Sequence, residues 1–280
     1  MNNICELYSI KNPSKSFSHG GKRINSFKDE NNFEPLISII TVVKNGEKFL
    51  NETFKSVFNQ SFKNWEYIVI DGVSTDKTVD IIKENQNWIN YWVSEKDDGI
   101  YHAFNKGLSL ARGQLIGFVN SDDTLEKNAL NILSDYYKKN PDKDFFFGAV
   151  KKHWGVLHGF KPEKISYSWG FYSSHSTGFF IKKKAAKEVG FYNVKYKYHA
   201  DYDYFYRMIV KKKLKGIATK KNELFGVFRR GGFSSKIPFR KLLFEEIRIR
   251  YDNNQNLFLL LVILFYKIIN NFTKFVKNKN

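Results

Sequence analysis

Residues 36–43 read LISIITVV, a short run of apolar and mostly β-branched residues that stops at Lys44. A run of this kind is typical of a strand that is buried on both faces of a sheet. Two similar runs follow, WEYIVID at residues 65–71 and QLIGFV at residues 114–119, with a shorter one at residues 89–93. Apolar residues at helical spacing fill the intervals. The alternation predicts an α/β fold, with a mostly parallel sheet flanked by helices.

The organisation of the chain changes near residue 141. Before it, helices are predicted at residues 46–60, 75–84, 100–111 and 125–139. After it the alternation weakens, and the pattern predicts strands at 144–150 and 178–181, an extended segment at 223–228 and helices at 202–210 and 239–251. No repeat or linker is visible, so we expect one continuous domain at residues 35–236, with a front at 35–140 and a back at 141–236. Residues 1–34 are a polar, loosely ordered lead-in, and residues 237–280 form a basic and apolar helical segment.

The charge of the chain is large and unevenly distributed. Lys and Arg number 46 against 28 Asp and Glu, a formal net charge of +18. Residues 1–140 carry a net charge of −1 and residues 141–280 carry +19, so a uniformly basic coat for nucleic acid describes the chain poorly. The single cysteine, Cys5, excludes an internal disulfide framework and a multi-cysteine zinc site, and it fits a reducing compartment.

The one long apolar run lies near the C-terminus, from Leu257 to Tyr266. A spanning helix needs roughly 20 apolar residues, so this run is too short to cross a membrane. Together with the basic residues around it, the run suits an anionic membrane surface. A helix packed on the protein core is the alternative. We expect a cytoplasmic protein that is peripheral on the cytoplasmic face of the membrane.

Polar residues follow three of the predicted strands. They are Thr41 and Asn45 at the end of the first, Asp71-Gly-Val-Ser-Thr-Asp76 after the second, and Asn120-Ser-Asp-Asp123 after the last. Right-handed crossovers would place these strand ends along one edge, where ligands of open α/β sheets bind. Each loop alone has an ordinary explanation, because Asp, Asn and Ser are common turn and cap residues. Ser74 or Asp76, for example, could cap the following helix.

Asp122 and Asp123 point to a metal ion. Two adjacent carboxylates after an apolar strand repel each other, and a divalent cation relieves that repulsion. Magnesium typically takes one or two carboxylates together with substrate phosphates. No glycine-rich phosphate loop follows the first strand, so a carboxylate-held metal is the obvious means of neutralising a diphosphate.

Five motifs in order, TVVKNG, IDGVSTDKT, SEKDDGIYHAFNKG, NSDD and HADYDYFYR, resemble the family 2 glycosyltransferases between about Leu36 and Lys236. The resemblance implies an inverting enzyme of the GT-A nucleotide-sugar fold, in a subgroup that builds bacterial surface polysaccharides. It also implies a nucleoside-diphosphate sugar as donor, a divalent metal (Mn or Mg) as cofactor, and a glycan or lipid-linked sugar as acceptor.

The resemblance also assigns residues by position. Asp201 matches the general base, and Asp122, with Asp123 next to it, matches the metal motif. Residues that match donor-nucleotide positions are Thr41, Val43, Asn45, Asp71, Ser74, Asp76, Asp97 and Lys106. Residues that match, or lie in segments suited to, acceptor or diphosphate contacts are Asn120, His175, Asp203, Arg207, Arg229 and Arg230.

The chain departs from the family pattern at several positions. Asn120 stands at the first metal-motif position, where it offers a carbonyl oxygen without charge, and Val73 replaces a glycine. His102 stands where the subgroup commonly has Asp, and Ala200 replaces the Glu before the base. Because of Asn120, the strictness of the metal requirement stays open.

Several assignments keep an alternative. Asp201 and Asp203 both precede apolar helical positions, so either one could be a helix cap and the other the base. His175 could be a hydrogen-bonded structural residue. Arg229 and Arg230 suit a loop that closes over a diphosphate, and they suit a solvated turn equally well.

Inverting transfer needs a base for the acceptor hydroxyl and stabilisation of the leaving diphosphate, and these residue types supply both. Three other functions are alternatives. A catalytically inactive nucleotide-sugar binder or assembly protein would keep the fold without the base or the metal. A nucleic-acid-binding protein would use the basic half but would leave the acidic strand ends unexplained. A nucleotidyltransferase would carry a glycine-rich basic signature that is absent. No nucleic acid partner is expected.

Overall fold

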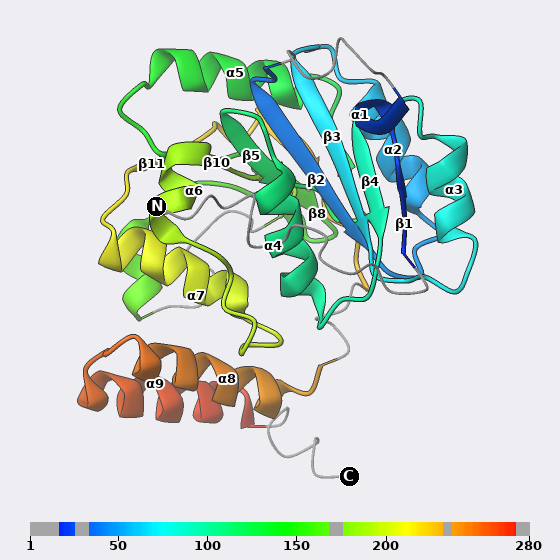
Figure 1. Cartoon of the computed structure of the whole chain (residues 1–280). Coiled ribbons are helices and arrows are strands. Elements are labelled where there is room, and N and C mark those ends of the chain that lie inside the picture. The colour runs from blue at the N-terminus through cyan, green and yellow to red at the C-terminus, as the bar shows by residue number, and fades with distance from the viewer. Residues whose placement is uncertain (1–16, 26–33, 168–175, 232–236, 273–280) are drawn as a thin grey trace.

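The computed structural model describes residues 17–25, 34–167, 176–231 and 237–272. Its centre is a mixed eight-stranded sheet in the order β1-β4-β3-β2-β5-β10-β7-β11 (Figure 1). These strands are β1 (Ser18–Gly20), β2 (Ile37–Val43), β3 (Trp65–Asp71), β4 (Tyr91–Ser94), β5 (Leu115–Phe118), β7 (Phe145–Phe147), β10 (Phe179–Lys182) and β11 (Gly216–Ala218). A second sheet in the order β6-β12-β8-β9 contains β6 (Thr124–Leu125), β8 (Ala149–Lys152), β9 (Gly155–Leu157) and β12 (Leu224–Val227).

Helices cover the central sheet and extend beyond it at the C-terminal end of the chain. They are α1 (Lys22–Asn25), α2 (Leu50–Phe58), α3 (Thr78–Glu84), α4 (Ile100–Leu110), α5 (Ala129–Lys139), α6 (Lys183–Val189), α7 (Ala200–Tyr206), α8 (Phe239–Asp252) and α9 (Leu257–Asn270). A 3₁₀ turn at Pro162–Ser166 and a π turn at Arg207–Lys211 complete the described elements.

The strands β2, β3, β4 and β5 form a continuous parallel block of the sheet, and β7 and β11 form a further parallel pair. All seven residues of β2 are buried, because β3 and β5 flank it and both faces are covered. Along β2, Ile39 belongs to a core with α2, α3 and α5, whereas Ile40 belongs to a second core with α4, α6 and α7. This burial on two faces explains why the run is continuously apolar instead of alternating.

The front of the fold agrees with the sequence analysis, and the element boundaries differ at most by a few residues. The predicted 144–150 strand, however, divides at Gly148 into β7 of the central sheet and β8 of the second sheet. A Cβ atom at Gly148 would lie 1.9 Å from the ring of Phe225, so only glycine allows the chain to pass from one sheet to the other here.

The lead-in at residues 1–34 is partly regular structure. Ser18–Gly20 pairs antiparallel with β4 and forms the edge of the central sheet, which the loosely ordered assignment did not anticipate. The pairing uses backbone groups, and SHG has no apolar alternation that would have revealed a strand. Residues 1–16 and 26–33 lie outside the described part.

The C-terminal segment folds as a hairpin of α8 and α9 at the bottom of Figure 1, and α8 contacts α7. Arg250 on α8 is fully buried, and its guanidinium bonds Glu246 and the carbonyl oxygen of Ser166 at 2.9 and 2.7 Å. Lys267 on α9 also bonds Glu246, at 2.6 Å. Within the described ranges, no helix has the length and apolar character to cross a membrane.

Candidate functional site

The carboxyl ends of β2, β3 and β4 lie level at one edge of the central sheet. In the parallel register, Val43 pairs with Asp71 and Asp71 pairs with Ser94. On the other side of β2, β5 ends at Phe118 and leads into Asn120. The structure therefore brings to one edge the strand-end loops that the sequence analysis singled out.

Asp71 is fully buried at this edge. Its carboxylate accepts hydrogen bonds from the backbone amide of Ser74 at 3.0 Å and from the hydroxyls of Ser74 and Ser94 at 2.5 and 2.6 Å. The hydroxyl of Ser74 is thereby turned toward Asp71, so Ser74 does not cap α3. Asp71 organises its own loop, and a direct contact of its side chain with a nucleotide would require these bonds to be exchanged.

Asn45 and Asp76 join the loops after β2 and β3. The amide of Asn45 donates to the hydroxyl of Ser74 at 2.7 Å, and the amide of Thr75 donates to Oδ1 of Asn45 at 2.8 Å. Asp76 accepts from the amides of Glu47 and Thr78, and these bonds lower the pKa of its carboxyl against the opposing effect of desolvation. Of the two residues expected to cap α3, Ser74 and Asp76, it is therefore Asp76 whose carboxylate accepts a hydrogen bond from the first residue of the helix. The two loops hold each other in place.

Thr41 and Val43 lie in the core rather than on the exposed edge. Thr41 is fully buried, and its hydroxyl donates to the carbonyl oxygen of Val119 at 2.7 Å and lies 2.8 Å from the hydroxyl of Tyr67. Burial raises the pKa of Tyr67 far above its ordinary value. The hydroxyl of Thr41 therefore ties β2 to β3 and to the residue after β5, and the match of Thr41 to a donor-contacting position stays a prediction.

A charge cluster lies after β4. Lys106 is nearly buried and pairs with Asp97 at 2.6 Å and with Glu95 at 2.9 Å. Burial raises the pKa of Asp97, and the ammonium of Lys106 opposes that rise. A Cβ atom at Gly72 would lie 3.1 Å from Oδ2 of Asp97, which places this carboxylate directly against the loop after β3. Asp97 and Lys106 thus lie beside the predicted nucleotide loop as a neutralised pair.

The NSDD segment places its two aspartates in different surroundings. Asp123 is only 1% exposed, and it accepts hydrogen bonds from the hydroxyl of Thr177 at 2.7 Å and the backbone amide of Arg229 at 2.9 Å. Burial raises the pKa of Asp123 to about 7. Both carboxylate oxygens of Asp123 thus accept hydrogen bonds within the fold, and its assignment as a metal ligand stays a prediction.

Asp122 and Asn120 keep oxygen atoms for a ligand. Asp122 is half-buried, and burial raises the pKa of its carboxyl while the guanidinium of Arg229 opposes that rise. Oδ1 of Asn120 is buried and has no hydrogen-bond partner within the described part of the chain. No group of three or more His, Cys, Asp and Glu side chains that could hold a metal occurs among the described residues. One carboxylate and one amide oxygen still fit Mg²⁺ or Mn²⁺, because such ions take their remaining ligands from phosphate and water.

Asp201 lies at the first turn of α7 and is 7% exposed. Its Oδ1 accepts a hydrogen bond from the hydroxyl of Tyr101 at 3.1 Å and from the backbone amide of Tyr202 at 2.9 Å. Tyr101 is the second residue of α4, which starts a few residues after β4 ends. This bond therefore brings Asp201, from the back of the chain, to the carboxyl edge of the sheet.

Asp203 and Arg207 have a structural role. One oxygen of Asp203 accepts from Nε of Arg207 at 2.8 Å, and the other accepts from Asn253, the C-cap residue of α8, at 3.0 Å. The guanidinium of Arg207 continues to the carbonyl oxygens of Val189 and Phe191. These bonds fasten α7 to its neighbours, and neither aspartate caps α7 through its side chain.

Glu245 on α8 holds the segment that leads into α7. Its carboxylate accepts hydrogen bonds from the backbone amides of Lys197, Tyr198 and His199 at 2.9, 2.6 and 2.8 Å. The hydroxyl of Tyr101 shares its one proton between Oδ1 of Asp201 and the carbonyl oxygen of Tyr198, which lies 3.0 Å from it. Glu245 thus fixes the backbone that leads into α7, and with it the position of Asp201.

Arg229 lies beside the acidic segment. Its Nε donates to the carbonyl oxygen of Asp122 at 3.0 Å, its guanidinium pairs with Glu52, and it lies 4.0 Å from the ring centroid of Phe49. Arg230 is exposed. His175 falls outside the described residues. Of the two arginines predicted to contact a diphosphate, Arg229 lies at the NSDD segment.

Two further residues at the site were not identified from the sequence. One is Tyr101, whose bond to Asp201 joins positions that are 100 residues apart. The other is Lys152 at the end of β8, a half-buried cation that lies 4.4 Å from the ring centroid of Phe228. Burial lowers the pKa of Lys152, and the charge of Asp123 opposes that effect. Tyr101 lies inside the GIY motif and could have been singled out, whereas nothing in the sequence marks Lys152.

The chain is similar in sequence to other glycosyltransferases. One is an uncharacterized glycosyltransferase of Methanocaldococcus jannaschii, 27% identical over 238 residues, which are 80% of this chain and 82% of that protein. Another is a chondroitin synthase of Escherichia coli, 34% identical over 110 residues, which are 38% of this chain and 16% of that protein. The match to the synthase thus covers a small part of its length.

Solved structures show the same fold. S. aureus TarS in complex with UDP superposes with a TM-score of 0.61 at 18% identity, covering 85% of this chain and 72% of that chain. The mannosyltransferase PcManGT from Pyrobaculum calidifontis, in complex with GDP-Man and Mn²⁺, gives a TM-score of 0.58 at 14% identity and covers 84% of this chain and 70% of that chain. The fold is of the GT-A type, as predicted.

The family follows from a model match over most of the parallel sheet and the site. The model of glycosyl transferase family 2 matches residues 38–218, which include every strand-end loop described above and Asp201. The chain belongs to glycosyltransferase family 2.

Proposed function

We propose that this family 2 glycosyltransferase transfers a sugar from a nucleoside-diphosphate sugar to a glycan or lipid-linked acceptor with inversion at the anomeric carbon. The observation that carries the proposal is the hydrogen bond between Tyr101 and Asp201, because it holds a carboxylate from α7 at the carboxyl edge of the sheet. Ligands of open α/β sheets bind at that edge. The complexes of TarS with UDP and of PcManGT with GDP-Man support a nucleotide sugar as donor.

Asp201 is the proposed general base. Its location distinguishes it from Asp203: the bond to Tyr101 holds Asp201 at the carboxyl edge of the sheet, whereas Asp203 is bonded to Arg207 and Asn253. In the reaction, the acceptor oxygen forms a bond to the anomeric carbon while its proton passes to the carboxylate of Asp201. The bond from the anomeric carbon to the diphosphate oxygen breaks, and the diphosphate leaves with the electron pair. Attack from the face opposite the leaving group inverts the configuration.

The leaving diphosphate is stabilised at the NSDD segment. Asp122 and the amide oxygen of Asn120 would hold Mg²⁺ or Mn²⁺, which supplies Lewis-acid stabilisation to the diphosphate when bound. Arg229 and Lys152 bring two cations to the same segment, since one contacts the backbone of Asp122 and the other lies within electrostatic reach of Asp123. In the nucleotide part, Asp71, Asn45, Ser74 and Asp76 shape the loops, and Asp97 and Lys106 lie against them.

The acceptor is proposed to belong to surface-polysaccharide synthesis. The match to a chondroitin synthase supports a polysaccharide product, and the apolar, basic C-terminal segment supports an acceptor at the cytoplasmic face of a membrane. The chain would then comprise a transferase domain at residues 35–236 and a peripheral membrane segment at residues 237–280.

Nucleotide binding tests the proposal without knowledge of the sugar. The melting temperature of the protein is measured with UDP, GDP, dTDP or CMP, each with Mn²⁺ and with EDTA. We expect one diphosphate to stabilise the protein by about 2–3 kcal/mol at a concentration about 100-fold above its Kd, with the larger shift in Mn²⁺. Stabilisation by DNA but by none of these nucleotides would contradict the proposal. Binding without turnover of any donor would indicate an inactive nucleotide-sugar binder.

A further inference from the structure

The outer face of α9 is apolar and exposed. Its side chains Leu257, Phe258, Leu261, Val262, Phe265 and Ile269 are each between 48% and 76% exposed. They recur at helical spacing, so they form one stripe on the side of α9 away from the buried Leu260 and Ile263. Soluble proteins rarely expose a continuous apolar surface of this kind without a partner for it.

The side chains of α9 are arranged oppositely to those of a helix that faces water, because its charged residue is inside and its apolar residues are outside. Lys267 is the one charged residue of α9, and it is only 8% exposed. Its ammonium lies 2.6 and 2.7 Å from the carboxylate oxygens of Glu246, in the interior of the hairpin. The chain thus buries the charge of α9 and leaves its aromatic and aliphatic side chains outside.

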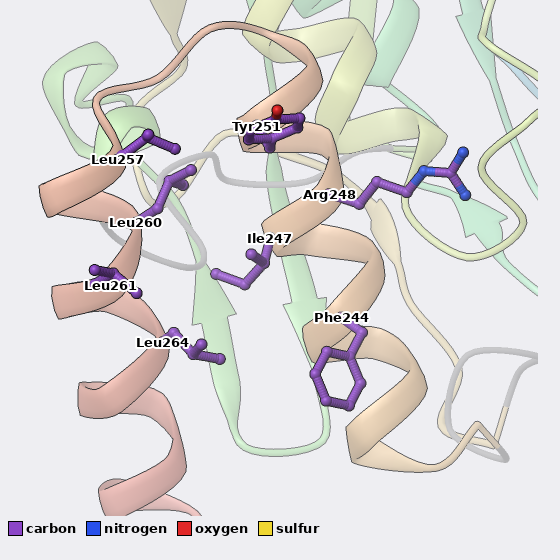
Figure 2. A pocket seen from close by; sticks show the side chains of 8 residues that line it. All are labelled: Phe244, Ile247, Arg248, Tyr251, Leu257, Leu260, Leu261 and Leu264. Atoms are coloured by element: carbon purple, nitrogen blue, oxygen red, sulfur yellow. The ribbon is translucent and has the colours of Figure 1, made fainter.

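A groove between α8 and α9 continues this surface. It has a volume of about 560 Å³ and is lined by apolar side chains of both helices. Figure 2 shows Ile247 and Leu264 pointing toward the space between the helices, whereas the guanidinium of Arg248 points away from α9. Arg248 makes one long contact, at 3.7 Å, with Asp252, and that carboxylate also binds Tyr196. The groove is therefore apolar, with the one cation Arg248 at its edge.

We propose that the α9 face and this groove insert into the interfacial layer of a membrane that contains anionic lipid. At about 1.5 Å per residue, the 14 residues of α9 span about 21 Å, which suits a helix lying in the plane of the membrane. The inference deepens the proposed peripheral placement and rests on it. Its test needs no sugar donor, so it can fail while the transferase proposal stands.

Charge favours lipid over a second copy of the chain as the occupant. Exposed cations on the adjoining helix α8 are Lys241 and Arg248, and the sequence after α9 adds Lys274, Lys277 and Lys279 with no acidic residue. Two copies would bring these like charges together, whereas anionic headgroups complement them. In Figure 1 the strands β2 and β3 also run toward the side of the molecule where the hairpin lies, so an inserted hairpin would turn the site toward the membrane.

The test is co-sedimentation of the full chain with vesicles of phosphatidylcholine alone or mixed with phosphatidylglycerol. We expect binding to the mixed vesicles, weakened by high salt. The triple variant Phe258→Ser, Phe265→Ser and Ile269→Ser should lower the partition coefficient by more than about tenfold. A matched variant, Trp154→Ser, Tyr167→Ser and Val194→Ser, removes large apolar side chains that are at least half exposed elsewhere and should bind like the wild type.

A second measurement does not depend on the triple variant. In Phe265→Trp, the added fluorescence relative to wild type should be quenched by brominated acyl chains. Absence of quenching, or a full-length chain that stays in the supernatant with anionic vesicles, would overturn the proposal. So would a dimer in solution that the triple variant converts to a monomer, because the face would then be an interface between copies.

Discussion

Val73 has a backbone conformation that β-branched residues rarely adopt. Its φ is 57°, in the left-handed region, between the buried Asp71 and the hydroxyl of Ser74. For an L-residue this conformation costs roughly 1–2 kcal/mol, and a valine is a particularly poor fit. Asn45 has φ 53°, also in the left-handed region, where Asn is far better tolerated. The strain at Val73 is therefore concentrated in the proposed nucleotide loop.

Replacing Val73 with glycine should relieve this strain. We expect Val73→Gly to raise the free energy of unfolding by up to about 1 kcal/mol, after the entropy cost of glycine is included. Val194 is exposed and is absent from the positive-φ residues, so Val194→Gly is a suitable control and should destabilise the protein slightly. Urea unfolding compares the two. Equal destabilisation by both changes would show that the loop is unstrained.

The sequence predicted which residues lie at the edge of the sheet, but not which of their side chains are exposed. Asp71, Asp122 and Asp123 follow apolar strands, so their location was clear. The burial of Asp71 depends on Ser94 and that of Asp123 on Thr177, partners from distant segments. Thr41 is buried because Val119 offers it a carbonyl acceptor. Such contacts follow from the packed fold and not from local pattern.

At the scale of elements, α8 supports α7 through Glu245. Three consecutive backbone amides ahead of α7 donate to this one carboxylate. The helix thus sets the entry of α7 and with it the location of Asp201. Glu245 is a positioning residue, because its bonds reach the backbone before Asp201 and not Asp201 itself.

Glu245→Gln should reduce catalysis more than donor binding. A glutamine side chain offers one acceptor and directs its own donors toward the amides, so α7 should shift. We expect kcat to fall about 10- to 100-fold with KM for the donor little changed. Glu188→Gln, on the exposed side of α6, is the control and should match wild type. A rise in KM with unchanged kcat would contradict the positioning role.

Asp252 at the end of α8 makes the docking of the hairpin sensitive to acid. The hydroxyl of Tyr196 and the ammonium of Lys195 lower the pKa of this carboxyl below its ordinary value. A lowered folded-state pKa contributes stability that is complete above the unfolded-state pKa, about 3.9, and is lost as the pH falls through the folded-state value.

The free energy of unfolding should therefore decline below about pH 4, and Asp252→Asn should remove part of that decline. Urea unfolding at about pH 6 and about pH 3 measures the difference. Asp135→Asn, on the exposed side of α5, should leave the decline as in wild type. If Asp252→Asn loses as much free energy of unfolding between the two pH values as wild type does, the hydrogen bond with Tyr196 does not contribute to stability in solution.

Elements marked by a long apolar run were predictable from the sequence. Elements formed by backbone pairing, or where the chain passes from one sheet to the other, were not. β2 and β3 were clear from their runs, and α9 was expected as a helical, apolar end. β1 has three residues and no pattern, and the division at Gly148 depends on the ring of Phe225 from a distant strand. Packing decides these cases.

At the scale of the whole molecule, the uneven charge now has a structural location. The near-neutral first half provides the parallel sheet and the acidic segments at its edge. The basic second half provides Asp201, Arg229 and the α8–α9 hairpin. The two halves meet at the bond between Tyr101 and Asp201, on which the proposed reaction depends.

The most direct test of the central claim is the turnover of Asp201→Asn, measured with the nucleotide sugar whose diphosphate stabilises the protein most. Asp203→Asn serves as the matched variant. The account predicts that Asp201→Asn loses about 10²- to 10⁴-fold in kcat while keeping the nucleotide-induced rise in melting temperature. Asp203→Asn should instead lower the melting temperature of the free protein, because Arg207 loses its charged partner and keeps only carbonyl acceptors. Turnover within a few-fold of wild type in Asp201→Asn would contradict the assignment of Asp201 as the general base.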